Sequence, residues 1–188
     1  MSAFAPPEVT KDQRRHLSWF LSRRSAVDLL ALKVFPNPKE ITESVAAYHA
    51  VEHYLSHQGF ALGDRDTLLV AVGDGSTPRT AALFAHQTAW ACHSVDPRLR
   101  DRSWRIDRLT LHRCRIEECH FEAERVVIVA VHAHVDLARA RKAVAAEHVG
   151  VVAIPCCVPL DLDRPPDVAY EDFGIWSPHR TVKVWASA

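Results

Sequence analysis

Three short, unbroken apolar runs constrain the fold of this chain more than any other feature of its sequence. They cover residues 68–72, 126–131 and 150–154 and consist almost entirely of Leu, Val, Ile and Ala. An unbroken apolar run is typical of a strand buried on both faces, whereas a half-exposed strand alternates between apolar and polar residues. The runs therefore predict a largely parallel sheet that is covered by helices on both sides.

Helical segments are expected before and between these strands. The apolar spacing and the end signals place them at residues 10–35, 37–59, 77–85 and 136–148. The second has the clearest start, because Asn37 can cap it, Pro38 suits its first turn and Glu40 can complete a capping box. Alternation of buried strands with helices favours a doubly wound α/β fold, with the first two helices as an N-terminal extension that covers the sheet.

The C-terminal part departs from this alternation. Two strand-like segments, 168–176 and 181–185, are separated by only the four residues 177–180. Four residues cannot form a parallel crossover, so these two strands must form an antiparallel hairpin. Two further strands are expected at 90–95 and 109–116.

Charge and composition exclude several classes of protein. The 23 basic and 23 acidic side chains balance, which argues against a globally basic nucleic-acid coat. No apolar run approaches the roughly 20 residues of a membrane span, and the first residues do not resemble a signal peptide. The five cysteines are an odd number in no disulfide-scaffold spacing, so we expect a reduced, cytoplasmic protein without membrane contact.

A glycine-bearing turn follows the first apolar run and leads into a helix. Gly73 and Gly75 would let a ligand approach the backbone closely, and the helix amides near Thr77 would favour an anionic group. Asp96 lies 21 residues beyond Gly75, an offset that places an acid at the end of the neighbouring strand. This pattern has two main interpretations, a nicotinamide-dinucleotide domain and a methyltransferase domain.

The terminal hairpin favours the second interpretation. It resembles the last two strands of class I S-adenosylmethionine-dependent methyltransferases, whose seven-stranded, mostly parallel sheet ends in this way. The stretch 70–75 resembles their glycine motif, 94–97 resembles their second strand with its acid, and 153–157 is similar to the Pro-Cys-Cys stretch of some RNA-methyltransferase-like families. The resemblance covers roughly 67–185.

The resemblance also implies how the chain is divided and where its cofactor binds. Residues 1–62 would form a tail and helical cap, and residues 63–188 a methyltransferase-like Rossmann domain, packed together as one compact unit. S-adenosylmethionine is expected to contact Gly73, Asp74, Gly75, Ser76, Thr77, Asp96, Arg115 and Ile116. The sequence departs from the family pattern at Ala71, where an acid is usual, and at Thr77 or Pro78, where a third glycine is common. Asp74 could take over the role of the missing acid.

The acceptor of the methyl group would enter above the fourth and fifth strands, beside His132, His134 and the sequence Pro155-Cys156-Cys157. The two histidines share one face if the strand continues through them, and either could act as a general base. The alternative is that both are solvated or bonded to loop backbone. Pro155 and Cys156 are expected to contact the acceptor. The two histidines and two cysteines could also bind zinc, but we expect no metal, because adjacent cysteines point apart on a strand.

Charge is unevenly distributed along the chain despite its overall balance. Residues 97–116 hold seven arginines and two acids, and residues 159–174 hold five acids and one arginine. Arginine binds phosphate by paired hydrogen bonds, and a tryptophan can stack on a base, so the basic segment could follow an RNA strand. The residues expected to contact RNA are Arg100, Arg102, Trp104 and Arg105. The alternative is a solvated face that pairs with the acidic segment.

The sequence thus favours an S-adenosylmethionine-dependent methyltransferase with RNA as the acceptor. One alternative is a methyltransferase-like domain that no longer binds cofactor and serves as a binding or assembly subunit. Another is an NAD-dependent oxidoreductase, which the terminal hairpin disfavours. An Asn/Asp-Pro-Pro-aromatic motif is absent from the sequence, which argues against methylation of an exocyclic amino group.

Overall fold

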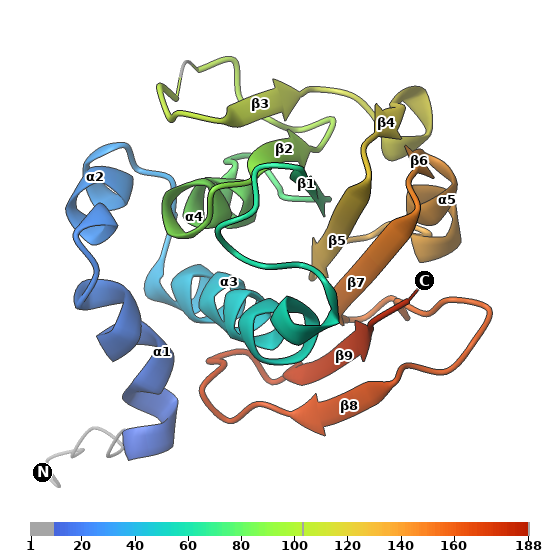
Figure 1. The fold of residues 1–188 in the computed structure, drawn as a ribbon. Coiled ribbons are helices and arrows are strands. Elements are labelled where there is room, and N and C mark those ends of the chain that lie inside the picture. The colour runs from blue at the N-terminus through green and yellow to red at the C-terminus, as the bar shows by residue number, and fades with distance from the viewer. Residues whose placement is uncertain (1–9, 103, 188) are drawn as a thin grey trace, which may run out of the picture.

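The computed structural model describes residues 10–102 and 104–187, and a seven-stranded sheet forms its centre (Figure 1). The strands are β1 (Thr67–Val72), β2 (Ala91–Val95), β3 (Leu109–His112), β5 (Arg125–Val131), β7 (His148–Ile154), β8 (Val168–Glu171) and β9 (Thr181–Trp185). Their order across the sheet is β3-β2-β1-β5-β7-β9-β8. Neighbouring strands are parallel except β9, which runs antiparallel to both β7 and β8. The predicted mostly parallel sheet with a terminal antiparallel hairpin is confirmed.

The three apolar runs form β1, β5 and β7, which are neighbours in the middle of the sheet. Every residue of β5 from Val126 to Val131 is at most 4% exposed. Alternate residues of a strand point to opposite faces, so Leu69 and Ala71 pack in one core layer while Val70 packs in the other. The three runs are therefore apolar at each position because both faces of these strands are covered, as the sequence predicts.

Helices cover both faces of the sheet (Figure 1). One face carries α3 (Pro38–Ala50) and α4 (Arg79–Gln87), with α1 (Lys11–Leu21) against α3 and α2 (Ser25–Ala31) against α4. The other face carries α5 (Leu137–Lys142), the 3-10 turn Ile116–Glu118, and the short parallel pair of β4 (Phe121–Glu122) and β6 (Val144–Ala145). Within the described residues, no helix is both long and apolar enough to cross a bilayer.

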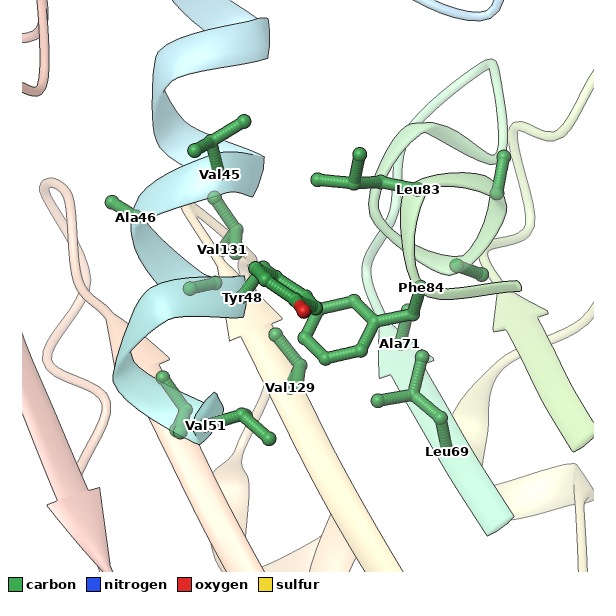
Figure 2. Packing of buried hydrophobic residues seen from close by; sticks show 14 of the residues in the cluster. Val45, Ala46, Tyr48, Val51, Leu69, Ala71, Leu83, Phe84, Val129 and Val131 are labelled. Atoms are coloured by element: carbon green, nitrogen blue, oxygen red, sulfur yellow. The ribbon is translucent and has the colours of Figure 1, made fainter. Parts of the chain in front are cut away.

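The N-terminal helical extension shares its core with the sheet. Figure 2 shows Tyr48 of α3 and Phe84 of α4 meeting beside Val129 of β5, and the ring centroids of Tyr48 and Phe84 lie 5.5 Å apart. The chain continues from α3 through the π-helical turn Val51–Leu55 and the 3-10 turn Ser56–Gln58. This continuation packs against β7 at Gly150, where an added Cβ would lie only 2.8 Å from the side chain of Leu55.

The helices predicted over 10–35 and 136–148 differ most from the structure. Residues 10–35 form two helices instead of one, because the chain turns after α1, where the Ser22 hydroxyl donates to the Trp19 carbonyl. The helix predicted over 136–148 ends at Lys142, because the residues that follow it, Val144 and Ala145, form β6 and pair with β4.

Three other boundaries also differ from the prediction. The strand predicted over 109–116 ends at His112, and Ile116 begins a 3-10 turn. The strand predicted over 168–176 ends at Glu171, because Asp172 turns the chain and its carboxylate accepts from the amide of Gly174. Helix α4 begins at Arg79 instead of near Thr77.

Candidate functional site

The loop between β1 and α4 contains both glycines of the predicted motif. Gly73 and Gly75 have φ angles of +66° and +88°, in the left-handed region that favours glycine. The Gly73 amide donates to the Val95 carbonyl at 2.8 Å, which joins this loop to the end of β2. A Cβ added at Gly73 would lie 2.6 Å from the Cβ of Ala133, in the loop after β5. Gly73 therefore allows two loops of the protein to touch.

Asp74 points into the protein and caps α4. Its buried carboxylate accepts from the amides of Thr80 at 2.9 Å and Ala81 at 3.2 Å, and from the Ser94 hydroxyl at 2.9 Å. Burial raises the pKa of Asp74, although these hydrogen bonds oppose the shift. Asp74 therefore caps the amino end of α4 from outside the helix.

Asp96 follows β2 and holds the glycine loop in place. It is 3% exposed, and one carboxylate oxygen accepts from the Gly75 amide at 2.9 Å. The other accepts from the Arg98 amide at 2.7 Å. The predicted proximity of the acid to the glycine loop is thus present, and the acid is already bonded to that loop.

A cavity of about 420 Å³ opens at the carboxyl ends of β1, β2, β3 and β5. Five predicted site residues line it: Gly73, Asp96, Arg115, Ile116 and His134. Val72, Val95 and Pro97, which belong to the two stretches that resemble the family's motifs, also line it. The rest of the lining was not predicted as part of this site: Arg98, Cys114, Glu117, Val135, Asp136 and Arg139. Asp74, Gly75, Ser76 and Thr77 are not among the described residues that line the cavity.

His132 and His134 lie in different surroundings, because the strand does not continue through them and the condition for a shared face is not met. Strand β5 ends at Val131, and His132 has a φ of +49°, which turns the chain. The Nε2 of His132 donates to the His179 carbonyl at 3.0 Å, and its Nδ1 lies 3.2 Å from a carboxylate oxygen of Glu43. Burial lowers the pKa of His132, while the Glu43 carboxylate opposes the shift. His134 is exposed and lines the cavity.

Cys156 and Cys157 lie in a bend after β7, together with the half-buried Pro155. The chain has left the strand at this point, so the two side chains need not point apart. The Sγ of Cys157 lies 3.3 Å from the Nε2 of His134, and the two Sγ atoms are 3.8 Å apart. The loops after β5 and β7 thus bring His134 and both thiols together, whereas His132 is bonded elsewhere.

The part of the basic segment that was expected to contact RNA lies on the loop between β2 and β3. Arg100, Arg102 and Arg105 are exposed. Trp104 is only 5% exposed and packs in the core, so its ring cannot stack on a base as predicted. Among the ion pairs of residues 10–102 and 104–187, those three arginines have no acidic partner, so the predicted pairing with the acidic segment is not formed.

The cap helix α3 supplies two acids that the sequence did not single out as site residues. Glu40 binds the Arg79 guanidinium at 2.7 Å, and an added Cβ at Gly75 would lie 3.1 Å from Nη1 of Arg79. Glu43 is 1% exposed and binds Lys39 at 2.6 Å as well as His132. Glu43 could have been recognised from the sequence, because it lies on the buried side of a predicted helix, where an acid needs a partner.

Comparison with known proteins gives structural matches alone. No family model matches the sequence, and no curated protein matches it. A point mutant of the nicotianamine synthase MtNAS, crystallised with S-adenosylmethionine, shares 13% identity at a TM-score of 0.51, covering 93% of this chain and 71% of that one. A second structure of the same mutant has a TM-score of 0.52 and 13% identity, covering 93% of this chain and 69% of that one. At this identity the likeness establishes a shared fold.

Proposed function

We propose that this chain, which has the fold of class I S-adenosylmethionine-dependent methyltransferases, is itself a methyltransferase that uses S-adenosylmethionine. The observation that carries the proposal is the cavity at the carboxyl ends of the strands. The strand order reverses between β1 and β5, and ligands of open α/β sheets bind at such a switch point. The cavity lies there, lined by residues that follow both strands, and its volume of about 420 Å³ suits a small-molecule ligand.

The chemistry of the lining fits the adenosine part of this cofactor. Val72, Val95 and Ile116 offer apolar contacts to a planar base. An ionised carboxylate has about four acceptor positions, so Asp96 can bind ribose hydroxyls while it keeps its bonds to the loop. When bound, S-adenosylmethionine supplies an electrophilic methyl group. Of the loop residues, Gly73 lines the cavity and would face its methionine part, whereas the Asp74 carboxylate is turned into the protein. A methionine carboxylate placed beside Gly75 would compete with Glu40 for the Arg79 guanidinium.

A binding assay tests this proposal directly. Calorimetry of the full chain should show binding of S-adenosylhomocysteine and none of NAD. Asp96→Ala should weaken that binding by about 1.5–3 kcal/mol, the value of hydrogen bonds to a charged group, or roughly 10- to 150-fold. Asp96→Asn keeps an acceptor oxygen for the Gly75 amide and separates loss of the ribose contact from loss of the loop. Asp107→Ala, an exposed acid at the far end of the β2–β3 loop, is the matched control.

A domain that binds partners without cofactor is the second candidate. Two observations favour it. Both Asp96 oxygens already accept hydrogen bonds from backbone amides, and Ala133 already lies against Gly73, so the groups that a cofactor would contact are engaged by the protein itself. Failure of the unaltered chain to bind S-adenosylhomocysteine would establish this candidate over the methyltransferase. NAD binding would instead favour an oxidoreductase, which the antiparallel β9 disfavours.

RNA is the acceptor that we propose. The support is the exposure of Arg100, Arg102 and Arg105 without acidic partners among the described residues. RNA binding should weaken steeply with salt, because each neutralised phosphate releases counterions. Replacing the three arginines by alanine should flatten this dependence, whereas replacing Arg14 and Arg24 on the cap should not. A salt-independent profile of the unaltered chain would return the three arginines to a solvated face.

The acceptor side of the site is proposed to consist of His134, Pro155 and Cys156. His134 is exposed between the main cavity and a second cavity of about 450 Å³, so it can contact an acceptor, while His132 is held by Glu43 and the His179 carbonyl. All five cysteines are free, which supports a reducing, cytoplasmic location.

A further inference from the structure

Three soft ligand atoms converge at the rim of the main cavity. They are the Nε2 of His134 and the Sγ atoms of Cys156 and Cys157, and all lie within 4.8 Å of one another. None of the three side chains is fully buried, so an ion can reach them from solvent. The two sulfur atoms are 3.8 Å apart, well beyond the roughly 2.05 Å of a disulfide bond.

The distances fit tetrahedral coordination of zinc. Zinc binds sulfur at about 2.3 Å and imidazole nitrogen at about 2.0 Å, so tetrahedral angles separate two sulfur ligands by about 3.8 Å and sulfur from nitrogen by about 3.5 Å. The structure gives 3.8 Å between Cys156 and Cys157 and 3.3 Å between Cys157 and His134. Two of the three separations thus match tetrahedral coordination, and the third is at most 4.8 Å.

The sheet positions the two loops that carry these ligands. Val131 of β5 is registered with Ile154 of β7, so both strands end at the same level. The amide of His132 donates to the Ile154 carbonyl at 2.8 Å, which holds the loops together beyond the strands. The spacing of ligands therefore depends on the rigid centre of the fold.

We propose that His134, Cys156 and Cys157 bind a Zn²⁺ ion and leave its fourth position open. Binding would release the protons of the two thiols to solvent and leave two thiolates and a neutral imidazole as ligands, without any redox change. Three protein ligands with an open fourth position are typical of zinc sites that activate a ligand rather than support a fold. His134 would then act as a metal ligand and not as a general base.

The open position would serve the acceptor. His134 also lines the second cavity, together with Val158 and Asp161, and Asp96 is not among the described residues that line it. An acceptor hydroxyl or thiol bound to the ion would lose its proton more readily and become the stronger nucleophile. This role rests on the proposed methyltransferase function, whereas binding of the ion does not.

Metal titration of the full chain tests the site without reference to activity. After chelator treatment, one Zn²⁺ per chain should bind in competition with a chromophoric chelator, and Co²⁺ should give sulfur-to-metal charge-transfer absorption. His134→Ala, Cys156→Ser and Cys157→Ser should each weaken binding by more than about 100-fold, beyond what loss of an outer-shell partner costs. Cys119→Ser is the matched control, because Cys119 belongs to a separate thiol pair with Cys114 and should leave the affinity unchanged.

Alkylation of the unaltered chain gives a second measurement that needs no variant to fold. Zn²⁺ should protect Cys156 and Cys157 from iodoacetamide, as mapped by mass spectrometry, and should leave the labelling of Cys119 unchanged. Absence of stoichiometric zinc, absence of the charge-transfer band, or protection of Cys114 and Cys119 instead would overturn the proposal. Rapid labelling of Cys157 that zinc does not slow would identify a free nucleophilic thiol in its place. S-adenosylhomocysteine binding is measured in a separate assay, so a failure of zinc binding can be distinguished from a failure of cofactor binding.

Discussion

Replacing Gly73 by alanine should destabilise the protein strongly, because two independent costs coincide at this position. A side chain at a φ of +66° costs about 1–2 kcal/mol in the left-handed region. The added Cβ would also lie 2.6 Å from the Cβ and 3.2 Å from the Cα of Ala133, so relief requires movement of backbone rather than of a flexible side-chain end. Forced repacking of this kind costs about 1–3 kcal/mol. Urea unfolding should therefore show a loss of about 2–5 kcal/mol.

Two further variants separate these costs. Gly63→Ala is the matched control, because an added Cβ at Gly63 meets nothing within 4 Å, and its effect should stay within about 1 kcal/mol. In the double variant Gly73→Ala with Ala133→Gly the 2.6 Å contact between the two Cβ atoms is removed, while the 3.2 Å approach to the Cα of residue 133 remains. The two substitutions should therefore be coupled by about 1–3 kcal/mol. If Gly73→Ala cost no more than Gly63→Ala, the close approach of the two loops would not contribute to stability.

Three other predictions concern stability and thiol chemistry. Burial lowers the pKa of His49 and His93 to about 4, below the roughly 6.5 of the same groups in an unfolded chain. Their contribution to the free energy of unfolding is therefore full above pH 6.5 and is lost as the pH falls toward 4. We expect a loss of about 1–3 kcal/mol per histidine over this range in urea unfolding, and a Gln substitution at either position should flatten the profile. Asp74→Ala should cost about 2–4 kcal/mol in the same assay, since it leaves three buried donors unpaired, and a loss below 1 kcal/mol would contradict the capping role. Mild oxidation should join Cys114 to Cys119, whose sulfur atoms lie 3.1 Å apart, and peptide mapping that finds both still reduced would refute this.

The central sheet could be predicted because its signals are local. The runs 126–131 and 150–154 contain no polar residue, and only a strand covered on both faces needs that composition. The hairpin followed from the short link between its two strands. That link covers 172–180 and is longer than the predicted 177–180, but it is still too short for a parallel crossover. Asp96 was placed beside the glycine loop because parallel strands end at the same edge of the sheet.

The remaining features depend on contacts between distant segments, which no local pattern records. Trp104 has polar neighbours in sequence, yet it is buried because the loop after β2 folds back onto the core. The helix from Leu137 ends early because β6 finds a partner in β4, and that pairing has no signal within the helix. The thiol of Cys157 lies beside His134 because β7 ends at Ile154 and the chain bends after it, and no local pattern marks that end.

Helix α3 ties the N-terminal cap to the sheet, so neither part can be exchanged independently of the other. Its apolar side completes the core above β5 and β7, and Glu40 and Glu43 on the same helix hold Arg79 and His132 beside the site. A graft that joined the sheet to a cap from another protein would have to supply both acids at the same spacing as well as a matching apolar surface. Substitution of Glu40 or Glu43 in the cap would therefore act directly on Arg79 and His132 beside the site. Recombination at the junction near residue 62 would yield folded chimaeras only between sequences already matched on both sides of it.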